Sequence, residues 1–227
     1  MAVRIASTLV REPVFSDASE LWVHDRSPSR GSGYAGTLVY ELLADPVISS
    51  HLDALGEHHS ESLAHSLRVA FLSLGVGIEN GIAIDRLTTL GCGALLHDIG
   101  KRSIPPSVLE KQGSLSGEER RMMREHVRIG YEAVRNEQLP EGVGVIIVSH
   151  HEYQRNPYPR TDHANGRGRS YRGEWDDLAQ IVAACDMFDA VSKPRSYKKA
   201  HGITSVRRIM ADEYRGDPRF LPQVLRC

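Results

Sequence analysis

The sequence predicts an all-α protein, and three observations carry that prediction. From Thr37 onward, apolar residues recur at intervals of three and four, the spacing that places them on one face of a helix. The one stretch with high β propensity, VGVIIVSH at residues 143–150, has no partner strand nearby in the sequence, so we expect it to be helical as well. The 227 residues suffice for one substantial domain that buries its own core.

Two segments interrupt the helical pattern. Residues 1–35 contain the loop-like stretch DRSPSRGSGYAG and are predicted to be an irregular N-terminal extension, which leaves residues 36–227 as the helical domain. Residues 154–173 form a long loop with five arginines and a single acid, Asp162. Such loops are usually solvated, and the functional alternative is a basic lid over an anionic substrate.

Local signals set the expected helix boundaries. Pro46 divides residues 37–55 into two helices, and glycines end the helix over 57–77. Residues 84–101 are apolar nearly all round, as in a buried central helix. Ser116 and Glu119 have capping-box spacing at the start of a long amphipathic helix. Further helices are expected over residues 141–153, 174–192 with Asp176 or Asp177 as cap, 205–214, and 217–225 with Pro218 at the first helical position.

Charge and cysteine usage exclude several classes of partner. The formal net charge of −1 argues against bulk attraction to DNA or to an anionic membrane. No apolar run has the length of a membrane span, and the first residues lack a signal-peptide core. The three cysteines are widely spaced and form no zinc-type pair, which suggests a reducing compartment. We therefore expect a cytoplasmic protein.

Histidines and acids fall at helix ends and on apolar faces. Glu61 and His65 are four residues apart, so both project from one helical face and could share a metal. His97 and Asp98 are adjacent, hence about 100° apart on a helix. That separation suits ligands that reach toward two metals, with the carboxylate able to bridge. Asp186 lies in an apolar helix, where an acid needs a partner.

Eight such candidates occur in five predicted helices. Any one of them would more often be a satisfied polar group than a ligand, but together they indicate a metal site. Imidazole and carboxylate without thiolate favour iron, manganese or zinc in an open catalytic site over structural zinc. The candidates are Glu61, His65, His97, Asp98, His126, His150, His151 and Asp186.

The order of these motifs resembles the HD superfamily of metal-dependent phosphohydrolases, and within it the HD-GYP branch of bacterial cyclic-dinucleotide phosphodiesterases. The similarity runs from about Leu55 to Leu225. ESLAHSLRV resembles the first ligand helix of that family, and LLHDIGKRSIPPSVLEKQGSLSGEE resembles its HD-x-GK segment. HVRIGYEAV, HHE and ACDMFDAVSKPRSYKKA match the third ligand, the paired histidines, and the last aspartate with its Arg-x-Tyr-basic phrase.

The resemblance implies an HD-domain helical bundle that hydrolyses a cyclic dinucleotide such as c-di-GMP. It implies two or three divalent ions, iron or manganese first with zinc as an alternative, and a metal-bridging hydroxide. The ligands carried over are His65, His97, Asp98 and Asp186 for the first centre, and His126, His150 and His151 for a second centre that Asp98 bridges. Glu61 matches the additional ligand of members that hold a third metal.

The same resemblance assigns roles in catalysis and substrate binding. Asp98 and Lys101 would be catalytic, with Lys101 also binding a phosphate oxygen, while Arg195 and Lys198 match positions that contact the second phosphate. The plain alternatives are a helix C-terminal cation for Lys101 and solvated surface charges for Arg195 and Lys198. The remaining histidines are taken as surface or structural residues: His24, His51, His58, His59, His163 and His201.

The loop after HHE departs from the family pattern. Tyr158 and Pro159 are present, but the glycines that normally precede them are absent. Because this loop is associated in the family with substrate fit and partner recognition, three functions stay open. They are hydrolysis of c-di-GMP, hydrolysis of cyclic GMP-AMP or another nucleotide phosphate ester, and an inactive nucleotide-binding sensor or scaffold. A regulatory protein partner and a homodimer are the protein contacts that we consider.

Overall fold

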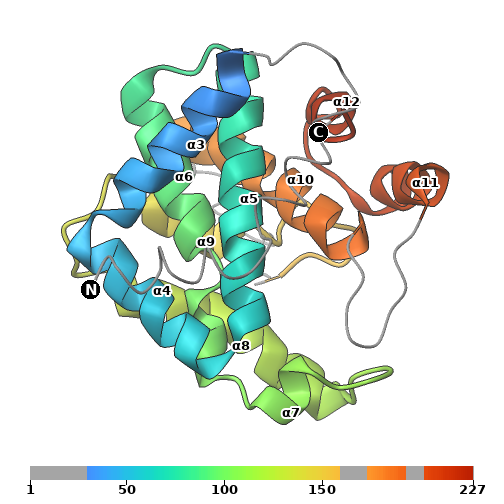
Figure 1. Cartoon of the computed structure of the whole chain (residues 1–227). Helices are drawn as coiled ribbons and strands as arrows, with labels where there is room; N and C mark the ends of the chain where they lie inside the picture. The colour runs from blue at the N-terminus through green and yellow to red at the C-terminus, as the bar shows by residue number, and fades with distance from the viewer. Residues whose placement is uncertain (1–29, 159–172, 193–201, 227) are drawn as a thin grey trace.

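The computed structural model describes residues 30–158, 173–192 and 202–226 (Figure 1). Within these ranges every extended regular element is a helix, beside one isolated bridge between Gln154 and Tyr214, which confirms the all-α prediction. The α-helices are α3 (Arg30–Leu43), α4 (Pro46–His58), α5 (Ser60–Glu79), α6 (Ile84–Leu96), α7 (Pro106–Leu109), α8 (Gly117–Val134), α9 (Val143–Ser149), α10 (Asp176–Ser192), α11 (Ile203–Glu213) and α12 (Phe220–Val224). Two short 3₁₀ helices are η1 (Ile99–Ser103) and η3 (Gly173–Trp175). None of the helices described here combines the length and apolar character needed to cross a bilayer.

Helix α5 is the centre of the bundle. It runs through the middle of Figure 1 and contacts α3, α4, α6, α10 and α12. The apolar residues Leu63, Leu67, Ala70 and Leu74 of α5 are buried, and the glycines near its end are buried too, so neighbours cover most of its circumference. Helices α6 and α10 pack on it and supply much of the remaining core. Residues far apart in the sequence therefore meet along one helix.

The N-terminal boundary differs from the expectation. Residues 30–35, expected to be irregular, belong to α3, and residues 1–29 lie outside the described part. The helix extends upstream because Ala35, Leu38 and Val39 are buried in the core that α3 shares with α5. Tertiary packing of an apolar face outweighs the low helix propensity of the glycines beside it.

Several other features predicted from the local sequence are present in the structure. Asp45 caps α4, with Pro46 at its first position, and the capping box of Ser116 and Glu119 opens α8. The β-prone stretch is helix α9, as expected. At the C-terminus, α12 begins at Phe220, so Pro218 lies in the preceding turn rather than at the first helical position.

The helix expected over residues 84–101 ends at Leu96 and continues into η1, which packs against α8. Gly100 permits this contact. A Cβ at this residue would lie 1.9 Å from the backbone oxygen of His126 and 2.7 Å from the backbone nitrogen of Gly130. The φ angle of Gly100 is not positive, so close approach of two backbones, rather than a left-handed turn, requires the glycine here.

Replacing Gly100 by alanine should therefore lower the free energy of unfolding by about 1–3 kcal/mol, because neither backbone can yield easily. The matched control is Gly117→Ala at the start of α8, where the new Cβ would meet only the tip of Arg121 at 4.0 Å. Urea denaturation of both variants measures the difference. Equal stability of the two variants would contradict the close-approach argument.

Candidate metal centre

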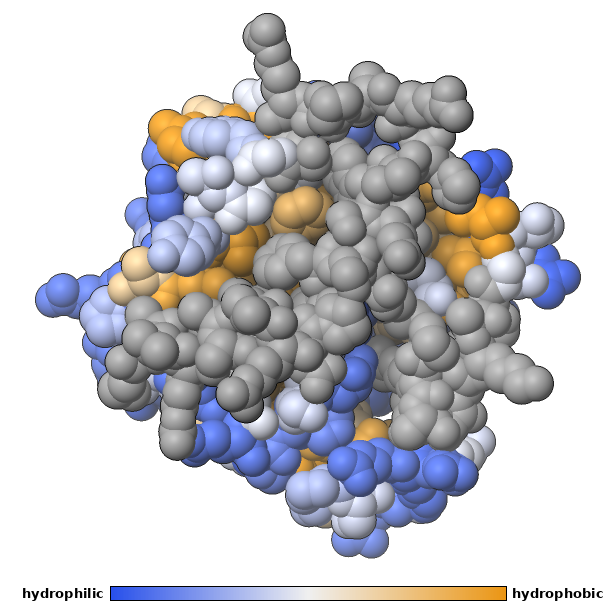
Figure 2. Space-filling view, in the orientation of Figure 1, coloured by the Kyte–Doolittle hydropathy of each residue, from blue (hydrophilic) through white to orange (hydrophobic). Residues whose placement is uncertain are grey.

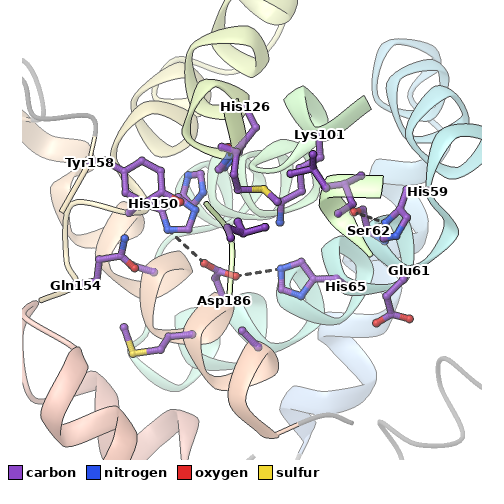
Figure 3. Close-up of a pocket in the computed structure, with 18 of the residues that line it drawn as sticks. His59, Glu61, Ser62, His65, Lys101, His126, His150, Gln154, Tyr158 and Asp186 are labelled. Carbon is purple, nitrogen blue, oxygen red and sulfur yellow. Dashed lines mark hydrogen bonds and ion pairs between the residues drawn. The ribbon is translucent and has the colours of Figure 1, made fainter. Parts of the chain in front are cut away.

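Seven of the eight predicted ligands converge in the interior of the bundle. Figure 3 labels His65, His126, His150 and Asp186 among them. Helix α5 contributes one of the seven, the α6–η1 junction two, α8 one, the end of α9 two, and α10 one. Their potential ligand atoms form three groups, each within 4.8 Å. The groups are Asp98, His126, His150 and His151; His65, His97 and Asp98; and His97, His150 and Asp186.

The carboxylate of Asp98 lies between imidazoles on two sides. Its Oδ2 atom is 3.5 Å from Nε2 of His65 and 3.4 Å from Nε2 of His97. Its Oδ1 atom is 3.3 Å from Nε2 of His126. Asp98 is 1% exposed, so the arrangement is shielded from water. Two oxygens that face two sets of nitrogens fit the bridging position expected for this residue.

Three of the histidines are anchored by the backbone of their own helical turn. In each, Nδ1 donates a hydrogen bond to the carbonyl oxygen three residues earlier, and because a carbonyl only accepts, Nδ1 must carry the hydrogen. The neutral ring then presents its Nε2 lone pair to the cluster. The pairs are His97 with Ala94 at 2.7 Å, His126 with Met123 at 2.6 Å, and His150 with Ile147 at 2.8 Å.

Buried polar atoms without hydrogen bonds mark the same place. Among the described residues, the Nε2 atoms of His97, His126 and His150 have no hydrogen-bond partner, and neither has Oδ1 of Asp98. Leaving such atoms buried and unsatisfied is costly, and native proteins rarely do so. A divalent cation would satisfy these lone pairs together, so the residues present fit a metal site.

His65 is anchored by a side chain that the sequence analysis missed. Its Nδ1 atom donates to Oδ2 of Asp189 at 2.7 Å. Asp189 is 3% exposed and also accepts two hydrogen bonds from Arg68, at 2.7 and 2.9 Å. A second acid in an apolar helix, three residues after Asp186, was the signal that could have identified it.

The charge states of the site follow from burial and from these contacts. Burial lowers the pKa of His126 and His150, so both rings are neutral at physiological pH. For His65 burial alone would lower the pKa, but hydrogen bonds with Asp186 and Asp189 raise it to about 9. Burial likewise opposes ionisation of Asp98, yet the ammonium of Lys101 and the ring of His97 hold its pKa well below the usual range.

Glu61 is the predicted ligand that stands apart. Its side chain is 55% exposed, and its Oε1 atom accepts a hydrogen bond from Nη2 of Arg68 at 3.1 Å. It belongs to none of the three ligand groups, and in Figure 3 its carboxylate points away from Asp186 and His126. The four-residue spacing from His65 placed it near the site, but the pairing with Arg68 directs its carboxylate elsewhere.

A cavity of about 370 Å³ opens over the cluster. Lys101 lines it and forms an ion pair with Asp98 Oδ2. Apolar side chains also line the cavity, among them Val108, Leu109, Leu115 and Met123. Arg195, Lys198 and Pro159 lie outside the described residues.

Two histidines expected to be surface or structural residues lie where α4 meets α5. His58 donates from Nε2 to the backbone oxygen of Ile104 at 2.7 Å, which is a structural role. His59 caps α5 through Ser62 and also lines the cavity, which the sequence analysis did not anticipate.

The family model described as HD domain matches residues 62–191. The chain belongs to the HD domain family. This membership confirms the resemblance that the histidine and aspartate motifs indicated.

Curated relatives agree with the HD-GYP branch of that resemblance. The cyclic di-GMP phosphodiesterase response regulator RpfG of Xanthomonas campestris is 33% identical over 158 residues, which cover 66% of this chain and 39% of that protein. A cyclic di-GMP phosphodiesterase of Thermotoga maritima is 33% identical over 65% of this chain and 39% of its own length. The 3'3'-cGAMP-specific phosphodiesterase 2 of Vibrio cholerae is 31% identical over 76% of this chain and 33% of its own length. The HD chain thus spans less than half of each of these relatives.

A solved structure supports the fold. The HD domain of the L. monocytogenes phosphodiesterase PgpH superposes with a TM-score of 0.52 at 18% identity, covering 71% of this chain and 80% of that one. At this identity the likeness concerns the arrangement of helices alone.

The anchoring of His65 leads to a test. Asp189→Asn keeps the size of the side chain but removes the charge that accepts from both His65 and Arg68. We expect the affinity for a divalent ion to fall about 10- to 100-fold while the helical fold persists. Competition with a chromophoric chelator measures the affinity. Asp85→Asn, an exposed acid in the first turn of α6, is the control, and an unchanged affinity in Asp189→Asn would exclude the anchoring role.

Proposed function

We propose that this HD domain is a metal-dependent phosphodiesterase that hydrolyses a cyclic dinucleotide, with c-di-GMP and 3'3'-cGAMP as the first candidates. The observation that carries the proposal is the convergence of seven imidazole and carboxylate side chains, five of them buried and Asp98 at their centre, beneath a cavity that Lys101 also lines. The names of the relatives supply the substrate class.

Two divalent ions are the cofactor that the ligand set supports best. Asp98 would bridge them, with His65, His97 and Asp186 on one side and His126, His150 and His151 on the other. The group of His97, His150 and Asp186 draws on both sides, so the two centres are contiguous. The exposed pairing of Glu61 with Arg68 favours two ions over three. Iron and manganese are the leading candidates, with zinc as the alternative.

The chemistry divides between the ions and the protein. When bound, a pair of divalent ions lowers the pKa of a water nucleophile and neutralises phosphate charge. The protein contributes the fixed imidazoles, the low pKa that keeps Asp98 ionised, and the ammonium of Lys101 at the cavity wall. Lys101 would stabilise charge that develops on a phosphate oxygen. The apolar part of the cavity wall offers a surface for a nucleobase.

The identity of the cyclic dinucleotide depends on the part of the site that departs from the family. The loop after HHE lacks the usual glycines. The relative rates of hydrolysis of c-di-GMP, cyclic GMP-AMP and other nucleotide esters therefore have to be measured. An inactive sensor is the less favoured alternative, because binding alone would not require so complete a ligand set. A cytoplasmic location, contacts of Arg195 and Lys198 with the second phosphate, a regulatory partner and a homodimer stay predictions.

One sample tests the proposal directly. Protein purified without chelator is analysed for metal, and then incubated anaerobically with iron(II) or manganese and with each cyclic dinucleotide, with products separated by chromatography. We expect two ions per chain and a linear dinucleotide or mononucleotide as product. His97→Ala and Asp98→Ala should lose metal and turnover together while the helical circular dichroism persists. Turnover in either variant would refute the metal-site assignment.

Lys101 separates phosphate stabilisation from metal binding. Lys101→Ala should bind metal at least as tightly as the unmodified protein, because the ammonium no longer competes for Asp98, while turnover falls about 100-fold. The control is Lys111→Ala, since Lys111 lines the same cavity but its ammonium is paired with Glu119 at 2.6 and 2.8 Å. Loss of metal in Lys101→Ala would instead make this lysine a structural support.

A further inference from the structure

His151 is held differently from the other histidines of the cluster. His65, His97, His126 and His150 each have Nδ1 fixed by a hydrogen bond to a carboxylate or to a backbone carbonyl. For His151 no hydrogen bond to a ring nitrogen occurs among the described residues, and its Nδ1 lies 3.9 Å from Oδ2 of Asp186. A ligand with no anchor of this kind needs another way to fix its orientation.

The ring of Tyr158 provides a stacking surface for His151. The two ring centroids are 4.4 Å apart and the planes are inclined by only 23°. The backbone N–H of Tyr158 also donates a hydrogen bond to the carbonyl of His151, at 3.4 Å. The segment that follows α9 therefore folds back onto the residues at its beginning. The same ring meets His126 edge to face, with centroids 6.2 Å apart at 83°. Tyr158 thus contacts two of the proposed ligands of the second centre.

Helix α8 secures Tyr158 from a different part of the chain. The guanidinium carbon of Arg124 lies 4.9 Å from the centroid of the Tyr158 ring, within the range of a cation–π contact. Arg124 is exposed and stands two residues before His126. The contact therefore ties the segment after α9 to the helix that supplies His126.

We propose that Tyr158 is the positioning residue of His151, and that Arg124 holds Tyr158 in place. The proposal rests on the metal site of the proposed function and adds to it the means by which the ligand without a hydrogen-bonded anchor is oriented. It also accounts for the presence of Tyr158 in a loop that lacks the usual glycines, because the stack needs the aromatic ring and not the glycines. Stacking uses the ring face, so the hydroxyl is not required.

Metal titration tests the proposal without recourse to turnover. Metal-free protein is titrated with manganese(II), and the free ion is followed by electron paramagnetic resonance to give the number of sites and their affinities. Tyr158→Leu should leave one ion bound as before and weaken the second about 10-fold. Tyr158→Phe should bind both ions as the unmodified protein does. Arg124→Met, a change on the exposed surface, should weaken the second ion about 2- to 5-fold.

Arg128→Met is the matched control for Arg124, since Arg128 is an exposed arginine of the same helix that pairs with Glu125 at 2.8 Å. Unchanged affinities in both Tyr158→Leu and Arg124→Met would overturn the proposal. It would also be overturned if Tyr158→Phe behaved like Tyr158→Leu, or if Tyr158→Leu weakened both ions equally. If the unmodified protein binds fewer than two ions, the proposed two-metal site itself fails, and the titration reports that outcome separately.

Discussion

The burial of the Asp98 carboxylate is the constraint around which this domain is organised. An ionised carboxylate withdrawn from water is strongly unfavourable unless opposite charges or hydrogen-bond donors surround it. Here the surrounding groups come from α5, α6, η1 and α8, which meet at one point because α5 and the α6–η1 junction pack tightly. The close approach of η1 to α8 at Gly100 brings His126 within reach. The packing of the bundle and the chemistry of the site therefore depend on the same contacts.

Helix ends explain why so many ligands are histidines with fixed rings. The last carbonyls of a helix have no partner within it. His97 and His150 directly follow α6 and α9, and each donates its Nδ1 hydrogen to a carbonyl of that final turn. One hydrogen bond thus satisfies a helix terminus and also sets the tautomer of a candidate metal ligand. Inside α8, the carbonyl of Met123 accepts the Nδ1 hydrogen of His126, which sets the tautomer of that ring in the same way.

Local features were predictable from the sequence, and long-range partners were not. Some features depend only on residues a few positions apart, so their patterns are visible in the sequence. Examples are helix periodicity, the capping box at Ser116, and the short motifs that contain the candidate ligands. The partner of His65 is Asp189, 124 residues away, and only the fold brings the two together. The pairing of Glu61 with Arg68, seven residues further along α5, is likewise not visible in the four-residue spacing from His65. Residues 30–35 show the same limit, since packing of α3 against α5 extends the helix into them.

Charge balance connects the site with the proposed substrate. Three buried or half-buried carboxylates, Asp98, Asp186 and Asp189, face three cations among the described residues: Lys101, Arg68 and His65, whose pKa of about 9 keeps it protonated at neutral pH. Because metal ligands must be deprotonated, His65 would give up its proton on holding a divalent ion, and Lys101 would lose its ion pair if Asp98 became a ligand. The loaded site would then carry an excess of positive charge beneath an open cavity. A cyclic dinucleotide has two phosphodiester anions, so such a site would attract the substrate class proposed above, and Lys101 would then be available to contact a phosphate oxygen.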